Sequence, residues 1–208
     1  MTVIDLTHPI TDNMPVYFPW HPATEIVQTA TYAHDRCEVR RLAIGTHSGT
    51  HIDAPSHILE GTPALDKYDP NLWCMKAQVL DFTPRQPRQE IMKEEVQEKL
   101  KQRGIGVIIK AGWDVHFGKN DYYKTYPPIS NAAAEFFLAM NVPLVAADTP
   151  FTLDVHYLLL RRGIPLVTNL NNTARLKEGI VTLISAPLLI AGADGAPARV
   201  FALVEKEG

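Results

Sequence analysis

The chain has little cysteine, no long hydrophobic run and no marked excess of charge. Its 208 residues include only two cysteines, Cys37 and Cys74. Neither stands in a Cys-x-x-Cys or cysteine–histidine spacing, which argues against a disulfide framework and a thiolate metal site. No window reaches the roughly 18 uninterrupted apolar residues that a membrane span requires, and the N-terminus lacks the basic start and apolar run of a signal peptide. We therefore expect a cytoplasmic protein that has no membrane partner.

The near balance of acidic and basic residues limits the kinds of partner that the protein can bind. The 20 basic and 23 acidic residues give a formal net charge of −3 and are spread along the chain. No basic stripe is available to bind phosphate backbones, so a nucleic-acid partner is not expected. With 46% hydrophobic residues, a chain of this length can form one sizeable core but is short for two ordinary domains. We predict one domain over residues 1–208.

Short β-branched runs outnumber helical patterns. The predicted helices cover Gln89–Arg103, Asn131–Met140 and Asp154–Arg162, the first ending before Gly104. Helices and strands alternate in the second half, whereas strands fill most of the first, which indicates an α/β domain with a mixed sheet. The strands are predicted at Thr2–Leu6, Glu25–Thr31, Glu38–Ile44, Ala77–Phe82, Val107–Lys110, Leu144–Ala146, Pro165–Val167, Val181–Ser185 and Val200–Val204.

Residues 45–61 concentrate side chains that can bind metals. They read Gly-Thr-His-Ser-Gly-Thr-His-Ile-Asp-Ala-Pro-Ser-His-Ile-Leu-Glu-Gly and hold three of the eight histidines. A helix is excluded, because Gly49 weakens it and Pro55 disfavours helical geometry at the residue before it. An extended or turning segment remains.

An extended segment brings two imidazoles and a carboxylate together. Side chains two residues apart point the same way in a strand, so His51 and Asp53 share a face, and His47 can join them through a turn at Gly49. Nitrogen and carboxylate ligands without thiolate suit Zn²⁺, Mn²⁺ or Fe²⁺, and three protein ligands leave positions open for water and substrate. We interpret the trio as a catalytic metal site and assign proton transfer to His57.

Two alternatives to the metal site have weaker support in the sequence. A lone histidine is most often a loop or core residue with its hydrogen bonds satisfied, but four ligand-type side chains within one short segment make that interpretation improbable here. A serine nucleophile at Ser48 or Ser56 would need a general base and an oxyanion hole, and the segment is not a Gly-x-Ser-x-Gly elbow.

The string from His47 to His57, His-Ser-Gly-Thr-His-Ile-Asp-Ala-Pro-Ser-His, resembles the HxGTHxDxPxH signature of the cyclase-like family, which includes bacterial kynurenine formamidases and isatin hydrolases. Further matching segments cover most of the chain. They are Asp5-Leu-Thr-His-Pro-Ile, Met14-Pro-Val-Tyr17, Ala111-Gly-Trp113, Asp148-Thr-Pro, His156 before Leu158-Leu-Leu, and Gly192-Ala-Asp-Gly-Ala-Pro-Ala-Arg199.

The resemblance implies a swivelling β/β/α fold, an oligomer, and a metal site with one or two ions. By position, His47, His51 and Asp53 would hold the first metal, His57 would transfer protons, and His156 would join a second metal. Formamidases supply another ligand, a glutamate, where this chain has Thr168. A neutral hydroxyl cannot supply the charge that a second buried dication requires, which argues against the second metal and against the formamidase substrate.

Three aromatic residues, Tyr17, Phe18 and Trp20, lie in a proline-punctuated loop. Large aromatics there indicate a pocket for a flat aromatic substrate or an interface with a neighbouring subunit, and both interpretations stay open. His21 is close enough in sequence to reach the same pocket. No role is assigned to the remaining scattered histidines, which are His8, His34 and His116.

The sequence therefore predicts a Zn²⁺- or Mn²⁺-dependent hydrolase of a non-peptide carbon–nitrogen bond. Resemblance to arylformamidases suggests conversion of N-formylkynurenine to kynurenine and formate, as in tryptophan catabolism. One alternative is hydrolysis of a cyclic, isatin-like amide with a single metal; another is a non-catalytic protein that contains metal and binds a small ligand. The expected partners are a small aromatic substrate and copies of the chain itself, as a homodimer or homotetramer.

Overall fold

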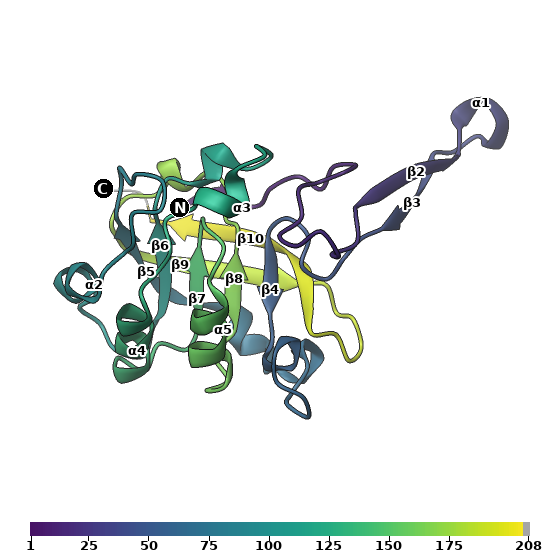
Figure 1. The fold of residues 1–208 in the computed structure, drawn as a ribbon. Helices are drawn as coiled ribbons and strands as arrows, with labels where there is room; N and C mark the ends of the chain where they lie inside the picture. The colour runs from purple at the N-terminus through teal and green to yellow at the C-terminus, as the bar shows by residue number, and fades with distance from the viewer. Residues whose placement is uncertain (206–208) are drawn as a thin grey trace.

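A computed structural model describes residues 1–205 and shows a mixed sheet that closes into a barrel (Figure 1). The strands follow the order β1-β10-β4-β8-β7-β6-β5-β9, and pairing of β9 with β10 closes a ring from which only β1 is left out. The predicted mixed α/β fold is confirmed. The bounds are β1 Thr2–Asp5, β2 Glu25–Ala30, β3 Val39–Ala43, β4 His51–Asp53, β5 Cys74–Asp81, β6 Gly106–Lys110, β7 Val145–Ala147, β8 Leu166–Thr168, β9 Gly179–Pro187 and β10 Gly195–Val204.

Helices cover one side of this barrel, where α5 lies against β8 and α4 packs between α5 and α2 (Figure 1). Each of these two helices begins at a hydroxyl residue, because the Ser130 and Thr152 side chains accept hydrogen bonds from the backbone N–H groups of Ala133 and Val155. The helices are α1 Tyr32–Asp35, α2 Lys93–Lys99, α3 Tyr122–Thr125, α4 Asn131–Ala139 and α5 Leu153–Leu160. The 3₁₀ turns are Pro55–His57, Leu65–Lys67, Pro70–Trp73, Asp114–His116 and Thr173–Arg175.

The parallel strands β5 to β8 form the buried wall between two cores. Successive β6 side chains alternate between them: Val107 and Ile109 pack with the helices, whereas Ile108 packs inside the barrel. Burial on both faces explains why β6 and β7 read as continuous apolar runs in the sequence. The wall therefore also has an outer, helix-facing surface on which side chains from α5 can meet side chains from strands.

The hairpin of β2 and β3 stands apart from the barrel as an arm that carries α1 at its tip (Figure 1). Its two strands pair only with each other among the described residues, and nearly all of their side chains are exposed or half-buried. Tyr32, Val39 and Leu42 are each about half exposed or more. A two-stranded hairpin is marginally stable alone, so this arm lacks the packing that would normally support it.

The structure corrects several sequence expectations. The helix predicted over Gln89–Arg103 spans only Lys93–Lys99, because Ile91 instead forms a β-bridge with Ile129. The sequence predicts only extended or turning chain where the structure has the short strand β4, which carries two of the candidate metal ligands. In residues 1–205, no helix is both long and apolar enough to span a bilayer. The domain span 1–208 stays a prediction, and its last three residues lie outside those described.

Candidate functional site

Strand β4 presents the central carboxylate of the site. Ile52 packs inside the barrel, so His51 and Asp53 project from the opposite, helix-facing side of the strand. Asp53 is 1% exposed. The register places Thr168 of β8 opposite His51, and Gly195 of β10 opposite Asp53.

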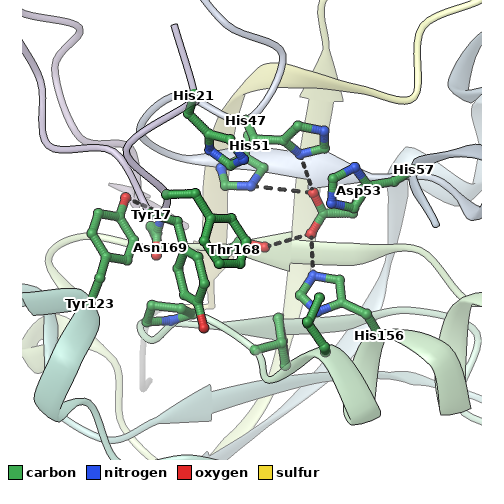
Figure 2. A pocket seen from close by; sticks show the side chains of 14 residues that line it. Tyr17, His21, His47, His51, Asp53, His57, Tyr123, His156, Thr168 and Asn169 are labelled. Atoms are coloured by element: carbon green, nitrogen blue, oxygen red, sulfur yellow. Dashed lines mark hydrogen bonds and ion pairs between the residues drawn. The ribbon is translucent and has the colours of Figure 1, made fainter. Parts of the chain in front are cut away.

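His47 reaches the same carboxylate through the turn that precedes β4. Gly49 adopts φ of +60°, a left-handed conformation that glycine accepts without strain. His47 Nδ1 lies 2.6 Å from Asp53 Oδ1, and His51 Nε2 lies 3.3 Å from the same oxygen. Figure 2 shows the two rings converging on Asp53. The predicted convergence of these three side chains is thus present in the structure.

Hydrogen bonds on the far sides of both rings determine which nitrogens face Asp53. His51 Nδ1–H donates to the Gly49 carbonyl at 2.8 Å, and His47 Nε2–H donates to Asp194 Oδ2 at 2.8 Å. Those acceptors carry no proton, so His47 Nδ1 and His51 Nε2 are the nitrogens available to a metal. This is the arrangement in which metal-binding histidines are usually held, with the second ring nitrogen bonded to a carboxylate or carbonyl.

The donor set fits a divalent ion. The ligand atoms of His47, His51 and Asp53 all lie within 4.8 Å of one another. Gly195 leaves the space that this arrangement needs, since a Cβ there would come 2.7 Å from both His47 Cε1 and the Ile52 carbonyl oxygen. Two imidazoles and one carboxylate suit zinc, manganese or iron and leave coordination positions open.

Without a metal, the same atoms share protons. Burial alone would raise the pKa of Asp53, but the charges and hydrogen bonds of His51, His156 and His47 hold that pKa well below its usual range. Burial lowers the pKa of His47, yet hydrogen bonds to Asp194 and Asp53 outweigh burial and raise it to about 9. The pocket thus holds a permanent negative charge at Asp53, which is the charge that a dication would bind.

Two further histidines flank the trio. His57 Nδ1 lies 3.1 Å from Asp194 Oδ2, and its ring centroid is 3.9 Å from that of His47. From α5, His156 donates through Nδ1–H to the Thr152 carbonyl at 2.8 Å and places Nε2 3.2 Å from Asp53 Oδ2. The Thr168 hydroxyl donates to that same Asp53 oxygen at 3.0 Å (Figure 2).

An aromatic pocket opens onto the histidines and encloses about 460 Å³, part of it open to solvent. Tyr17 and Phe18 line it as predicted, whereas Trp20 is 73% exposed and stacks on Phe18 with ring centroids 5.0 Å apart. Trp20 instead lines a neighbouring cavity. The two cavities share a wall made by His21, His47 and His57.

Sequence reasoning missed several residues of this site. Asp194 lies in the segment Gly192–Arg199, 137 residues after His57, and nothing in the local sequence marks its carboxylate as part of the site. Asn169 fixes the turn from the other side, donating through Nδ2 to the Gly49 carbonyl at 3.0 Å. Tyr123 and Phe151 complete the pocket wall, and no local pattern distinguishes them from core aromatics. The Ser56 hydroxyl has no hydrogen-bond partner in the described chain, so it lacks a general base.

Comparison with known proteins places this geometry in a family. The family model described as a putative cyclase matches residues 4–153. The chain belongs to this Cyclase family. The match covers the whole segment from His47 to His57, and it ends before His156, Thr168 and Asp194.

Individual relatives of the Cyclase family extend the similarity beyond residue 153. The kynurenine formamidase of Bacillus thuringiensis (strain Al Hakam) is 26% identical over 206 residues, covering 94% of each chain. Isatin hydrolase A from Labrenzia aggregata, bound to benzyl benzoate, superposes with a TM-score of 0.89 at 22% identity, covering 99% of this chain and 94% of that one. A predicted metal-dependent hydrolase from Bacillus stearothermophilus gives 0.79 at 24% identity, covering 97% of each.

Proposed function

We propose that this protein is a metal-dependent hydrolase that cleaves a non-peptide amide bond in a small aromatic substrate. The observation that carries the proposal is the convergence of His47 Nδ1, His51 Nε2 and an Asp53 oxygen beside an aromatic pocket. The kynurenine formamidase and isatin hydrolase relatives support the reaction class, since their names describe opening of a formamide and of a cyclic amide.

His47, His51 and Asp53 would hold one divalent ion, Zn²⁺ or Mn²⁺. When bound, such an ion lowers the pKa of a water ligand to about 7 and polarises a carbonyl oxygen. Thr168 and His156 occupy the other side of Asp53, where the hydroxyl of Thr168 donates to Oδ2. These contacts hold the carboxylate in place, and they supply no second anionic ligand for another dication.

The other residues of the site bind the substrate and move protons. Tyr17 and Phe18 offer ring faces against which an aromatic substrate can stack. His57 has Nδ1 held by Asp194, so its Nε2 is the nitrogen left to accept and return a proton as the carbon–nitrogen bond breaks. His57 therefore acts as the general acid and base.

Two substrate classes fit this reaction. The formamidase relatives favour a linear N-formyl aromatic amine such as N-formylkynurenine. The second candidate is a cyclic amide of the isatin type, and it is favoured by Thr168, whose neutral hydroxyl suits a single-metal site. A third possibility is a metal-containing protein that binds such molecules without turning them over, and it is decided by the turnover assay.

A turnover screen of the metal-loaded protein tests the proposal. Zn²⁺- and Mn²⁺-loaded samples are assayed on aromatic formamides, lactams and isatin-like rings, with Asp53→Ala as the matched inactive control. We expect turnover that requires added metal and vanishes in Asp53→Ala, together with loss of bound metal per chain from that variant. Metal occupancy equal to wild type in Asp53→Ala would refute the site, and binding of ring compounds without any turnover would identify a binding protein instead.

We further propose that the chain assembles as a homodimer or homotetramer. The supporting observation is the projecting arm, which exposes Tyr32, Val39 and Leu42 and pairs with no other strand of residues 1–205. The β9–β10 loop exposes a second apolar run, Leu188 to Ile190. A cytoplasmic location is kept as a proposal and agrees with both cysteines being free thiols.

A further inference from the structure

One carboxylate, that of Asp194, contacts both a proposed metal ligand and the proposed proton carrier. Its Oδ2 lies 2.8 Å from His47 Nε2 and 3.1 Å from His57 Nδ1. Since a carboxylate without a proton only accepts, both imidazoles must donate N–H to it.

The backbone around Asp194 is fixed by the strand that carries Asp53. The N–H of Ala54 donates to the Asp194 carbonyl at 2.9 Å, and Gly195 pairs directly with Asp53 in the β10–β4 register. The side chain is 39% exposed, so solvent reaches it, but its main chain cannot shift without moving β4. The carboxylate therefore holds a set position relative to Asp53.

We propose that Asp194 is a positioning residue that orients two histidines at once, presenting His47 Nδ1 to the metal and His57 Nε2 to the substrate. The inference rests on the proposed function. Its physical basis is tautomer selection: a proton kept on His47 Nε2 leaves the lone pair on Nδ1, and a proton kept on His57 Nδ1 leaves Nε2 free. The negative charge also makes the His47 ring a stronger donor to a cation.

Removal of the carboxylate should affect the two histidines in separately measurable ways. In Asp194→Ala, His47 can take either tautomer, so we expect the dissociation constant for Zn²⁺, measured by calorimetry, to rise about 10–100-fold. His57 loses its orientation in the same variant, so kcat should fall while KM changes little. Asp194→Asn keeps one acceptor oxygen, which can still accept a hydrogen bond from one imidazole N–H. This variant should therefore bind Zn²⁺ more tightly than Asp194→Ala does.

Asp5→Asn is the matched control. Asp5 is 38% exposed, pairs with Arg199 on the same strand β10, and has no hydrogen bond or ion pair with a histidine among the described residues. Its variant loses an ion pair near β10, so an effect caused only by weakening this strand would appear there too. We expect Zn²⁺ affinity and kcat of Asp5→Asn to match wild type, and thermal unfolding of both variants identifies any general loss of stability.

The measurements separate this inference from the proposed function. If Asp194→Ala binds Zn²⁺ as tightly as wild type and turns over equally fast, the inference is wrong while the function stands. If no substrate is turned over but Zn²⁺ affinity falls as expected, the function is wrong and the metal-positioning role stands. His47, His57 and Asp194 could themselves hold a cation. If wild type binds two Zn²⁺ per chain and Asp194→Asn binds one, Asp194 is a ligand of a second ion, and the proposal that it only positions the histidines is wrong.

Discussion

At the scale of single residues, the two oxygens of Asp53 have different partners. Oδ1 faces the ring nitrogens of His47 and His51, whereas Oδ2 accepts from Thr168 and faces His156. A carboxylate oxygen that already accepts a hydrogen bond from a hydroxyl group is less available to coordinate a second cation. We infer that the hydroxyl at position 168 limits the proposed site to one metal ion.

We predict that Thr168→Glu converts the site from one metal to two. The new carboxylate would stand beside Asp53 Oδ2 and His156 Nε2, giving a second dication two anionic ligands and an imidazole. Metal analysis should find about one Zn²⁺ per chain in wild type and about two in Thr168→Glu. Thr168→Gln has the same size without the charge and should stay at the wild-type value. An unchanged count in Thr168→Glu would show that residue 168 does not limit metal number.

For His57, we predict that substitution by asparagine preserves the metal but removes catalysis. Three ligands already form an open site, and a fourth would use a position needed for water or substrate. The variant should keep wild-type metal content while kcat falls by about 10²–10⁴-fold, the usual contribution of a positioned acid–base group. His34→Asn, an exposed histidine on the arm, serves as the control. A His57→Asn protein purified without metal would mean that His57 is a ligand.

At the scale of elements, the site is the junction of β4 with β8, β10 and α5. Alternation along β4 selects the face, so Ile52 enters the barrel and its two neighbours face α5. Strand β10 brings Gly195 against the His47 ring so closely that no side chain fits. Because three strands and a helix contribute, a small change in the backbone of β10 should be felt at the metal ligands.

We predict that Gly195→Ala disrupts the metal site. The added Cβ would lie 2.7 Å from His47 Cε1 and from the Ile52 carbonyl, so either the ring or the β4 backbone must move. The cost in unfolding free energy should be about 1–3 kcal/mol, as for other overpacked cores. Gly106→Ala is the control, since its Cβ meets Met75 Sδ at 3.0 Å, far from the histidines in the strand order. Both variants should lose stability, but only Gly195→Ala should lose Zn²⁺ affinity in calorimetry.

Much of this junction could be predicted from the sequence, and the rest could not for a physical reason. The trio His47, His51 and Asp53 is local, so strand periodicity and one glycine turn were enough to bring it together. Asp194 immediately precedes β10, whose Gly195 pairs with Asp53 of β4 across 142 residues of sequence, and no periodicity encodes such a pairing. The closing of the sheet by β9 and β10 was hidden for the same reason.

At the scale of the whole molecule, a buried histidine away from the site links stability to pH. His8 is 7% exposed and stacks on Phe117 with ring centroids 3.9 Å apart. Burial lowers its pKa to about 4, and this outweighs the opposing charge of Asp114. The unfolded chain, with an ordinary histidine pKa near 6.5, binds more protons between these two values.

We predict that His8 lowers the stability of the folded protein as the pH drops from 7 to 5. A folded pKa below the unfolded one means that this contribution is present above pH 6.5 and is lost toward pH 4. Denaturant unfolding at pH 7 and 5 should show wild type losing about 2 kcal/mol more than His8→Gln. Burial raises the pKa of Asp148 to about 6, and hydrogen bonds raise that of His47 to about 9, so both groups favour the folded state as the pH falls. Both are present in wild type and in His8→Gln, so their effects cancel in the comparison. Equal losses in both would exclude His8.

The exposed arm leads us to predict that the protein is a dimer or a tetramer in solution. Light scattering at micromolar concentration should give two or four times the mass of one 23.2 kDa chain. An isolated hairpin with apolar side chains in water is poorly stabilised, so a second copy covering Val39 and Leu42 is the arrangement that supports it. Val39→Asp combined with Leu42→Asp should shift the mass toward a single chain, because two charges would be buried without partners. Val115→Asp, at a site 66% exposed on a separate element, should leave the mass unchanged. A wild-type mass equal to one chain would contradict the assembly. If the double variant keeps the wild-type mass, the interface does not involve the arm, and the exposed run from Leu188 to Ile190 is the surface to substitute next.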